Sequence, residues 1–156
     1  MKNARIVSIA KSDQVGLYSI CFNDDKETEF RKFLQKFKDN AALNKDYQAI
    51  IHAIDRIIAN GALERNFRYE GKMNDNVVAL PVVQSKLRLY CLRLSDKILI
   101  LGNGGKKRSK TYEEDNELSG YVLTLQNFDQ LIKEGVNDGS IIVTENKIET
   151  DKTFDL

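Results

Sequence analysis

Residues 84–110 read QSKLRLYCLRLSDKILILGNGGKKRSK, and the other segments are most simply arranged around this stretch. Its first part, 87–94, has the alternating pattern of a β-strand whose two faces meet different surroundings. After a Ser-Asp-Lys turn, the apolar run 98–101 is typical of a strand covered on both sides. We therefore predict a hairpin whose second strand ends at the Asn-Gly-Gly of 103–105, because these residues favour turns.

The length and composition of the chain are those of one globular domain. Its 156 residues are 42% hydrophobic and 30% charged, which is enough apolar material for a core without disulfides or metal. No apolar run has the length of a membrane span or a signal peptide, so we expect a cytoplasmic protein. The formal net charge of +1 means that any affinity for nucleic acid must come from a local patch.

The cysteines and the histidine limit metal and redox chemistry. Cys21 and Cys91 lie in strand-like apolar contexts, where a free buried thiol is commoner than a disulfide. His52 is the only histidine, which excludes a multi-histidine metal site. It lies off the apolar stripe of its helix, so a solvent-facing position is expected. We therefore predict no cofactor and no metal.

The first half of the chain predicts two strands followed by two helices. Short apolar segments at 5–10 and 16–22 flank a turn and indicate strands. Apolar residues at helical spacing predict a first helix over 27–38 and a second over 46–60, which Gly61 ends. The short linker makes the two helices antiparallel neighbours that turn their apolar faces toward one sheet.

The remaining segments are shorter. Residues 77–83 contain the only proline, Pro81, and are interpreted as an edge strand or an irregular entry into the sheet, because proline cannot donate to a strand ladder. Residues 124–134 fit a short helix that ends at Gly135, and 139–145 fit a last strand. We thus predict an α+β fold, an antiparallel sheet of about four to six strands packed against an N-terminal αα-hairpin. In this interpretation, residues 1–156 form a single domain, with 18–111 as its core and 112–156 as a C-terminal helix–strand extension.

The order of strand, helix pair, hairpin and basic segment resembles the RelE/ParE/HigB superfamily of toxins from bacterial toxin–antitoxin pairs. The segment ILILGNGGKKRSKTYEE, 98–114, is similar to the place where HigB-type toxins leave an apolar strand and enter a Lys-Lys-x-x-Lys-Thr pattern. LRLYCLRL, 87–94, resembles the preceding family strand, which carries arginines at alternating places. The resemblance implies a RelE-like fold, an antitoxin partner and metal-independent cleavage of mRNA on the ribosome.

Cleavage of RNA by its own 2′-OH needs a base, cations around the phosphate and an acid for the leaving oxygen. Lysines crowded by other cations have a lowered pKa and are candidate bases. The candidate catalytic residues are Arg93, Lys106, Lys107, Arg108 and Tyr112, and the candidate RNA-binding residues are Arg88, Tyr90 and Lys110. Arg88 and Arg93 are five positions apart, so a regular strand places them on opposite faces and only one can serve a given site.

Other interpretations stay open. Loop lysines are commonly just solvated, and Tyr90 also fits the edge of a core. One alternative is a RelE-like binding module without catalysis, for nucleic acid or a partner protein. Another is a ParE-like inhibitor of a DNA topology enzyme. The chain has no P-loop and no serine-nucleophile motif.

Overall fold

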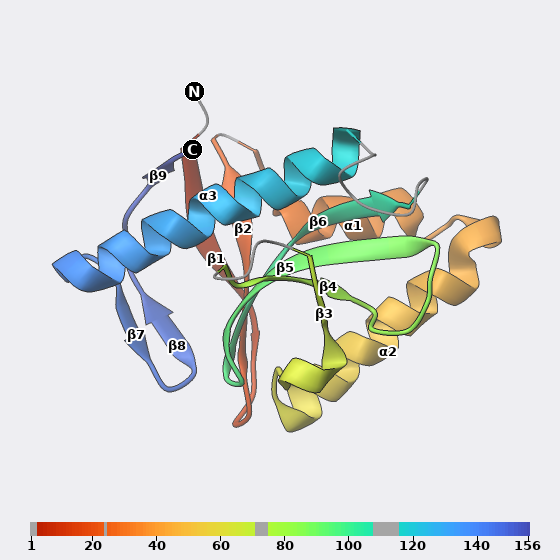
Figure 1. Ribbon diagram of the computed structural model, residues 1–156, viewed down its shortest axis with the longest axis horizontal. Coiled ribbons are helices and arrows are strands. Elements are labelled where there is room, and N and C mark those ends of the chain that lie inside the picture. The colour runs from red at the N-terminus through yellow and green to blue at the C-terminus, as the bar shows by residue number, and fades with distance from the viewer. Residues whose placement is uncertain (1–2, 24, 71–74, 108–115) are drawn as a thin grey trace.

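The computed structural model describes residues 3–23, 25–70, 75–107 and 116–156 (Figure 1). In the described part of the chain, two strands precede a pair of helices, four strands follow this pair, and three short strands follow the last helix. The helices are α1 (Glu29–Phe37), α2 (Asn44–Asn60) and α3 (Asn116–Asp138), and the 3-10 turns are η1 (Ala41–Leu43) and η2 (Glu64–Asn66). The strands are β1 (Asn3–Lys11), β2 (Gly16–Phe22), β3 (Arg68–Tyr69), β4 (Val77–Leu80), β5 (Leu87–Ser95), β6 (Ile98–Lys106), β7 (Ile142–Thr144), β8 (Lys147–Glu149) and β9 (Phe154–Asp155).

The main sheet is larger than predicted, and it is mixed. Seven strands lie in the order β3-β4-β5-β6-β2-β1-β9, and β7 and β8 form a separate two-stranded sheet. All neighbours are antiparallel except β2 and β6, which pair in parallel from Gly16–Ile98 to Ser19–Leu101. The predicted antiparallel sheet of four to six strands with an N-terminal αα-hairpin and a C-terminal extension is therefore wrong. The physical reason is that the β1–β2 hairpin adds to the β5–β6 hairpin side by side, with β2 parallel to β6.

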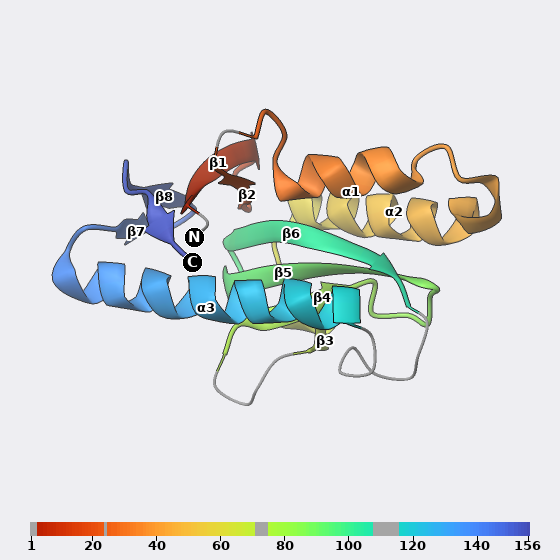
Figure 2. The ribbon, with the colours of Figure 1, turned by 90° about the horizontal axis from the view of Figure 1, so that it is seen from above.

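Helices cover both faces of this sheet. Seen from above, α1 and α2 lie on one side of β5 and β6, and α3 lies on the other (Figure 2). The two faces enclose separate apolar cores: Phe33, Ile50 and Ile57 belong to the first, and Phe128 and Phe154 belong to the second. Residues 116–156 thus supply one of the two helical layers, and β9 pairs with β1.

The predicted helices α1 and α2 are confirmed, with small shifts at their ends. Thr28 caps α1, since its hydroxyl accepts a hydrogen bond from the Arg31 amide at 3.1 Å. Gly61 ends α2 with a φ of +97°, a conformation that favours glycine. His52 is exposed, and Cys21 and Cys91 are buried free thiols, as expected.

The β5–β6 hairpin is confirmed, but β6 does not end at 103–105. It continues to Lys106, because Leu87, Arg88 and Leu89 on β5 pair with Lys106, Gly105 and Gly104. A Cβ at Gly104 would lie 1.8 Å from the Arg88 carbonyl oxygen, so glycine permits this close approach of the two strands. The glycines that predict a turn serve the strand pairing instead.

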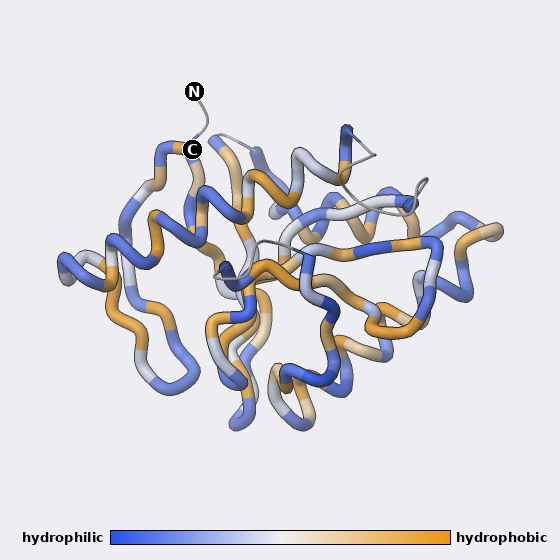
Figure 3. The backbone as a smooth tube through the Cα atoms, in the orientation of Figure 1, coloured by the Kyte–Doolittle hydropathy of each residue, from blue (hydrophilic) through white to orange (hydrophobic). Residues whose placement is uncertain are grey.

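The C-terminal elements also differ from expectation. Helix α3 is about twice as long as predicted. Hydrophilic and hydrophobic stretches alternate along it (Figure 3). Gly135 does not end the helix, which continues to Asp138. This glycine instead leaves room for Ile141, since a Cβ there would lie 2.4 Å from the Ile141 side chain. Strand β4 lies between β3 and β5, which excludes the edge strand of the two predicted arrangements, and Pro81 follows its last residue, Leu80. No helix in the described part of the chain is long and apolar enough to span a membrane.

Candidate functional site

Four charged side chains gather at the open end of the β5–β6 hairpin, on the face of the sheet that α3 covers. They are Arg68, Glu70, Arg88 and Lys107, and we call them the cationic cluster. Among the described residues, three cations face one carboxylate, so two positive charges are uncompensated within the cluster. An excess of positive charge held in place by strands is the arrangement that attracts phosphate.

Strand register brings these residues together. Arg68 on β3 pairs with Ala79 on β4, and Ala79 pairs with Tyr90 on β5. Arg88 is two residues from Tyr90, so it lies on the same face of the sheet as Arg68. Glu70 follows Tyr69 at the end of β3, and its amide donates to the Val77 carbonyl at 3.3 Å.

A bulge in β6 decides which lysine joins the cluster. Between the Leu89–Gly104 pair and the Cys91–Leu101 pair, β6 contains one residue more than β5. Beyond it, Lys106 lies opposite Leu87 and therefore on the α1–α2 face. Lys107 lies on the face of Arg88, and its amide donates to the Lys86 carbonyl at 2.7 Å.

Arg88 is the buried centre of the cationic cluster. It is only 2% exposed, and its Nη1 donates to the carbonyls of Ser85 at 3.0 Å and Leu87 at 3.2 Å. Its Nε lies 4.0 Å from Glu70 Oε1. Burial and the neighbouring Arg68 lower the pKa of Arg88. The guanidinium is therefore a fixed, weakly solvated charge behind the other residues.

The other members are half-buried and nearer to solvent. Burial raises the pKa of Glu70 even though Arg88, Arg68 and Lys107 oppose the shift. Burial, together with Arg88 and Arg68, lowers the pKa of Lys107. The Nη1 of Arg68 is buried and makes no hydrogen bond within the described residues. A buried donor without a partner is costly and is satisfied when an anion binds.

Of the predicted site residues, the structure brings Arg88 and Lys107 together. Arg93 lies on the opposite face of β5, where its Nε donates to the Ala62 carbonyl at 2.7 Å and its Nη2 pairs with Asp96. Tyr90 is 1% exposed and belongs to the core under α3. Arg93 is therefore away from the cluster, whereas Tyr90 lies beside Arg88 on the same face of the sheet but is buried under α3. The predicted residues Arg108, Lys110 and Tyr112 lie outside the described residues.

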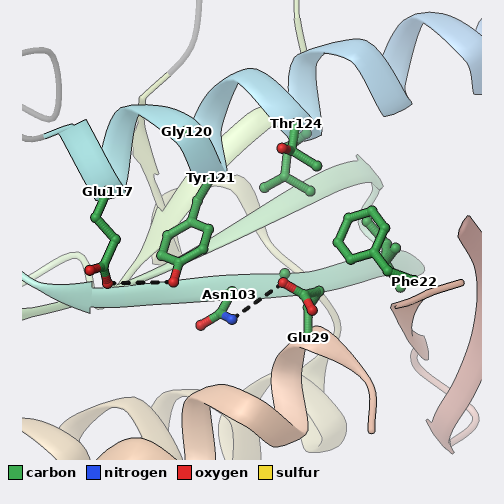
Figure 4. Close-up of a pocket in the computed structure, with 10 residues that line it drawn as sticks. Phe22, Glu29, Asn103, Glu117, Gly120, Tyr121 and Thr124 are labelled. Carbon is green, nitrogen blue, oxygen red and sulfur yellow. Dashed lines mark hydrogen bonds between the residues drawn. The ribbon is translucent and has the colours of Figure 1, made fainter. Parts of the chain in front are cut away.

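A second site lies between α1, β6 and α3, and we call it the α1–α3 cleft (Figure 4). Its cavity has a volume of about 240 Å³. The side chains that give it chemical character are Phe22, Glu29, Asn103, Glu117, Tyr121 and Thr124. A neighbouring cavity of about 360 Å³ shares Glu117 with it and is lined by Lys36 and Lys106. Lys106 therefore lines the cavity beside the α1–α3 cleft.

Hydrogen bonds connect the two cavities. The Lys36 ammonium donates to the Gly104 carbonyl at 2.9 Å and to the Tyr121 hydroxyl at 3.1 Å. Burial lowers the pKa of Lys36, although Glu117 and Glu29 oppose the shift. Burial, followed by the charge of Glu117, raises the pKa of Tyr121 to about 12. Tyr121 is thus a neutral hydroxyl near neutral pH, able to donate and accept.

The functional candidates missed at the sequence level come from segments far apart in the chain. Arg68 and Glu70 alternate around Tyr69, which is a strand signal in a segment that otherwise has no clear pattern. Glu29 and Lys36 are on α1, and Tyr121 is on a helical turn that lies before the predicted start of α3. Within the described ranges, no group of His, Cys, Asp and Glu residues could hold a metal ion. No protein-family model matches the chain, and searches of curated proteins and of solved structures gave no match either.

Proposed function

We propose that the protein is the toxin of a bacterial toxin–antitoxin pair and cleaves mRNA on the ribosome at the cationic cluster, without a metal. The observation that carries this proposal is the cluster itself, in which Arg68, Arg88 and Lys107 face the single carboxylate of Glu70. The proposed partners are a cognate antitoxin and ribosome-bound mRNA, and the proposed location is the cytoplasm. The likeness of 87–94 and 106–111 to HigB-type toxins supports the same class of function.

The charges of the cluster suit a phosphodiester. The buried Nη1 of Arg68 has no hydrogen bond to any residue that the structure describes, so Arg68 is the candidate for direct contact with a phosphate oxygen. Arg88 is held by two backbone carbonyls and acts from behind as a fixed positive charge. Such preorganised cations stabilise the charge that develops on a pentavalent phosphate.

Two titratable residues beside these cations suit acid–base catalysis. In the proposed reaction, the neutral amine of Lys107 takes the proton of the 2′-OH while O2′ attacks the phosphorus atom. The P–O5′ bond breaks, and the carboxyl group of Glu70 gives its proton to the leaving 5′-oxygen. The lowered pKa of Lys107 and the raised pKa of Glu70 both favour the protonation states that these roles need. The products would be a 2′,3′-cyclic phosphate and a 5′-hydroxyl.

The test is expression of the protein in bacterial cells without a partner. Growth and protein synthesis should stop, and purified protein should cleave RNA in the presence of EDTA to give the products named above. Lys107→Ala should lower the cleavage rate about 10²- to 10⁴-fold, the usual contribution of a general base. The matched control is Lys147→Ala, which removes the same charge from the exposed β7–β8 hairpin. Normal growth during expression of the intact, folded protein would refute the toxin proposal.

A second function, RNA binding without cleavage, is favoured by the position of Arg93. This predicted catalytic residue lies on the opposite face of β5 from Arg68 and Lys107, where it bonds Ala62 and Asp96. A binding module predicts RNA affinity that falls as salt rises, with no cleaved product. Product analysis therefore separates it from the toxin, and Lys107→Ala should weaken RNA binding in both cases.

A further inference from the structure

The irregular segment 81–86 holds two members of the cationic cluster in place. It joins β4 to β5 without helix or strand structure, at the open end of the β5–β6 hairpin (Figure 1). The Ser85 carbonyl accepts from Arg88 Nη1 at 3.0 Å, and the Lys86 carbonyl accepts from the Lys107 amide at 2.7 Å. The position of residues 85 and 86 therefore decides where Arg88 and Lys107 lie.

Asp46 anchors this segment to a helix. It lies in the first turn of α2, and its Oδ1 accepts from the Lys86 amide at 3.0 Å and from the Ser85 hydroxyl at 3.0 Å. The Ser85 hydroxyl oxygen also accepts from the Leu87 amide at 3.1 Å, where β5 begins. Among the described residues, the hydrogen bonds that connect 81–86 to a helix are the two that Asp46 accepts.

Asp46 and the cationic cluster belong to different sides of the sheet. The helix α2 covers one face, whereas Arg88 lies on the face of Tyr90, which packs under α3 (Figure 2). In the described part of the chain, Asp46 makes its side-chain hydrogen bonds to residues 85 and 86 and not to the cluster itself. An effect of these bonds on a phosphate at the cluster is therefore indirect.

An ionised carboxylate suits this anchoring role. One oxygen of Asp46 accepts two hydrogen bonds, and a charged acceptor forms stronger hydrogen bonds than a neutral one. The N-terminus of α2 also favours negative charge in its first turn. The hydrogen bond from the Lys86 amide, aided by that from Ser85, lowers the pKa of Asp46, so the carboxylate is charged near neutral pH. Alanine would remove the acceptor from both donors, whereas asparagine would keep an acceptor oxygen.

We propose that Asp46 is a positioning residue of the cationic cluster. By fixing residues 85 and 86 from α2, it keeps their carbonyls where they hold Arg88 and Lys107 for contact with a phosphate group. The RNA part of this inference rests on the proposed function, whereas the placement of Lys107 by Asp46 does not. Removal of the Asp46 charge alone would favour RNA binding, but release of the segment would take a phosphate contact away. The sign of the change in RNA affinity separates these two effects.

The test compares Asp46→Ala with Asp46→Asn by fluorescence anisotropy of a labelled single-stranded RNA. Both substitutions remove the same charge, but only asparagine keeps the acceptor oxygen. Asp46→Ala should lower the RNA affinity about fivefold at 0.1 M salt, which corresponds to the loss of one phosphate contact. Asp46→Asn should not lower it, and neither should Asp55→Ala, which removes a carboxylate from an exposed position of the same helix. In a protein that binds RNA, equal affinities of the two Asp46 variants would overturn the inference.

Hydrogen exchange measures the same coupling without RNA. In Asp46→Ala, the Lys107 amide should exchange about fivefold faster, the effect of one weakened hydrogen bond, because its acceptor, the Lys86 carbonyl, is no longer anchored. The Gly16 amide, which donates to the Lys97 carbonyl at 2.8 Å at the other end of β6, should keep its exchange rate and serves as the control for folding. Asp46→Asn should leave both amides unchanged. An unchanged Lys107 amide in a folded Asp46→Ala protein would overturn the inference.

The two measurements also separate this inference from the proposed function. Faster exchange of the Lys107 amide in Asp46→Ala, in a protein that neither binds nor cleaves RNA, would support the positioning role and refute the toxin proposal alone. Cleavage of RNA that depends on Lys107, together with unchanged exchange of its amide in Asp46→Ala, would refute the positioning role alone.

Discussion

Replacement of Glu70 by glutamine is the most direct test of the cationic cluster. The substitution keeps the shape of the side chain and removes the carboxylate that, among the described residues, faces Arg68, Arg88 and Lys107. At 4.0 Å from Arg88, the lost attraction is about 4 kcal/mol at an effective dielectric constant near 20. The raised pKa of Glu70 shows that the cost of burying its charge exceeds this attraction. We therefore expect the free energy of unfolding at neutral pH to change by no more than about 1 kcal/mol.

RNA binding should respond more strongly than stability. Glu70→Gln raises the uncompensated positive charges of the cluster from two to three. If the extra charge neutralises one further RNA phosphate, the plot of the logarithm of the binding constant against the logarithm of the salt concentration becomes steeper by about 0.7 for single-stranded RNA. At 0.1 M salt, this corresponds to an RNA affinity about fivefold higher. Because the same change removes the proposed acid, the cleavage rate should fall about 10²- to 10⁴-fold. Tighter binding and slower cleavage in one variant are the signature of this site.

The assay is fluorescence anisotropy of a labelled single-stranded RNA at several salt concentrations, with cleavage followed on gels. The matched control is Glu134→Gln, which makes the same change in net charge on an exposed position of α3. It should change neither the salt slope nor the cleavage rate. A folded Glu70→Gln protein with unchanged or weaker RNA affinity would show that this cluster does not meet phosphate. The pH profile adds a check: the rate should be greatest between the pKa of Glu70, above 4.5, and that of Lys107, below 10.5.

The remaining predictions concern the fold that holds these sites. Phe128→Ala should lower the free energy of unfolding by about 3–5 kcal/mol in urea denaturation, because this fully buried ring fills the core under α3. Gly104→Ala should destabilise the protein and weaken RNA binding together, since the new Cβ would meet the Arg88 carbonyl; unchanged values for both would contradict the strand register. Asp46→Asn should cost no more than about 1 kcal/mol near neutral pH, because the Asp46 carboxylate, which accepts from the Lys86 amide at 3.0 Å, is partly exposed and asparagine keeps an acceptor oxygen. Hydrogen bonds lower the pKa of Asp46, so the Asp46 carboxylate stabilises the folded protein above its ordinary pKa of 3.8, and this stabilisation is lost as the pH falls below that value. The free energies of unfolding of the original and Asp46→Asn proteins should therefore become equal in acid.

Local patterns predicted the elements that depend on nearby residues. The apolar spacing of α1 and α2, the stop at Gly61 and the β5–β6 hairpin are all present in the structure. These features follow from helical or strand periodicity within one segment, and each segment buries its apolar face wherever a partner layer is available. Buried positions for Cys21 and Cys91 could be predicted for the same reason.

The functional candidates depend instead on pairings between distant segments. Arg68 meets Arg88 only because β3 and β4 add to the edge of β5. Lys106 and Lys107 look like one basic cluster in the sequence, but neighbouring residues of a strand point to opposite faces of the sheet, and the bulge in β6 decides that Lys107 is the one that faces Arg88. A single extra residue in a strand reverses the face of every residue that follows, and no local pattern reports it.

The sequence by itself determined which segments are amphipathic, where helices stop and that the chain carries too little net charge for nonspecific attraction to nucleic acid. Only the tertiary structure decided that β2 joins β6 in parallel, that α3 covers the second face of the sheet and that a cleft opens where β2 and β6 part. The physical reason is that periodicity is a property of neighbouring residues, whereas register and strand order are set by the burial that distant segments reach together.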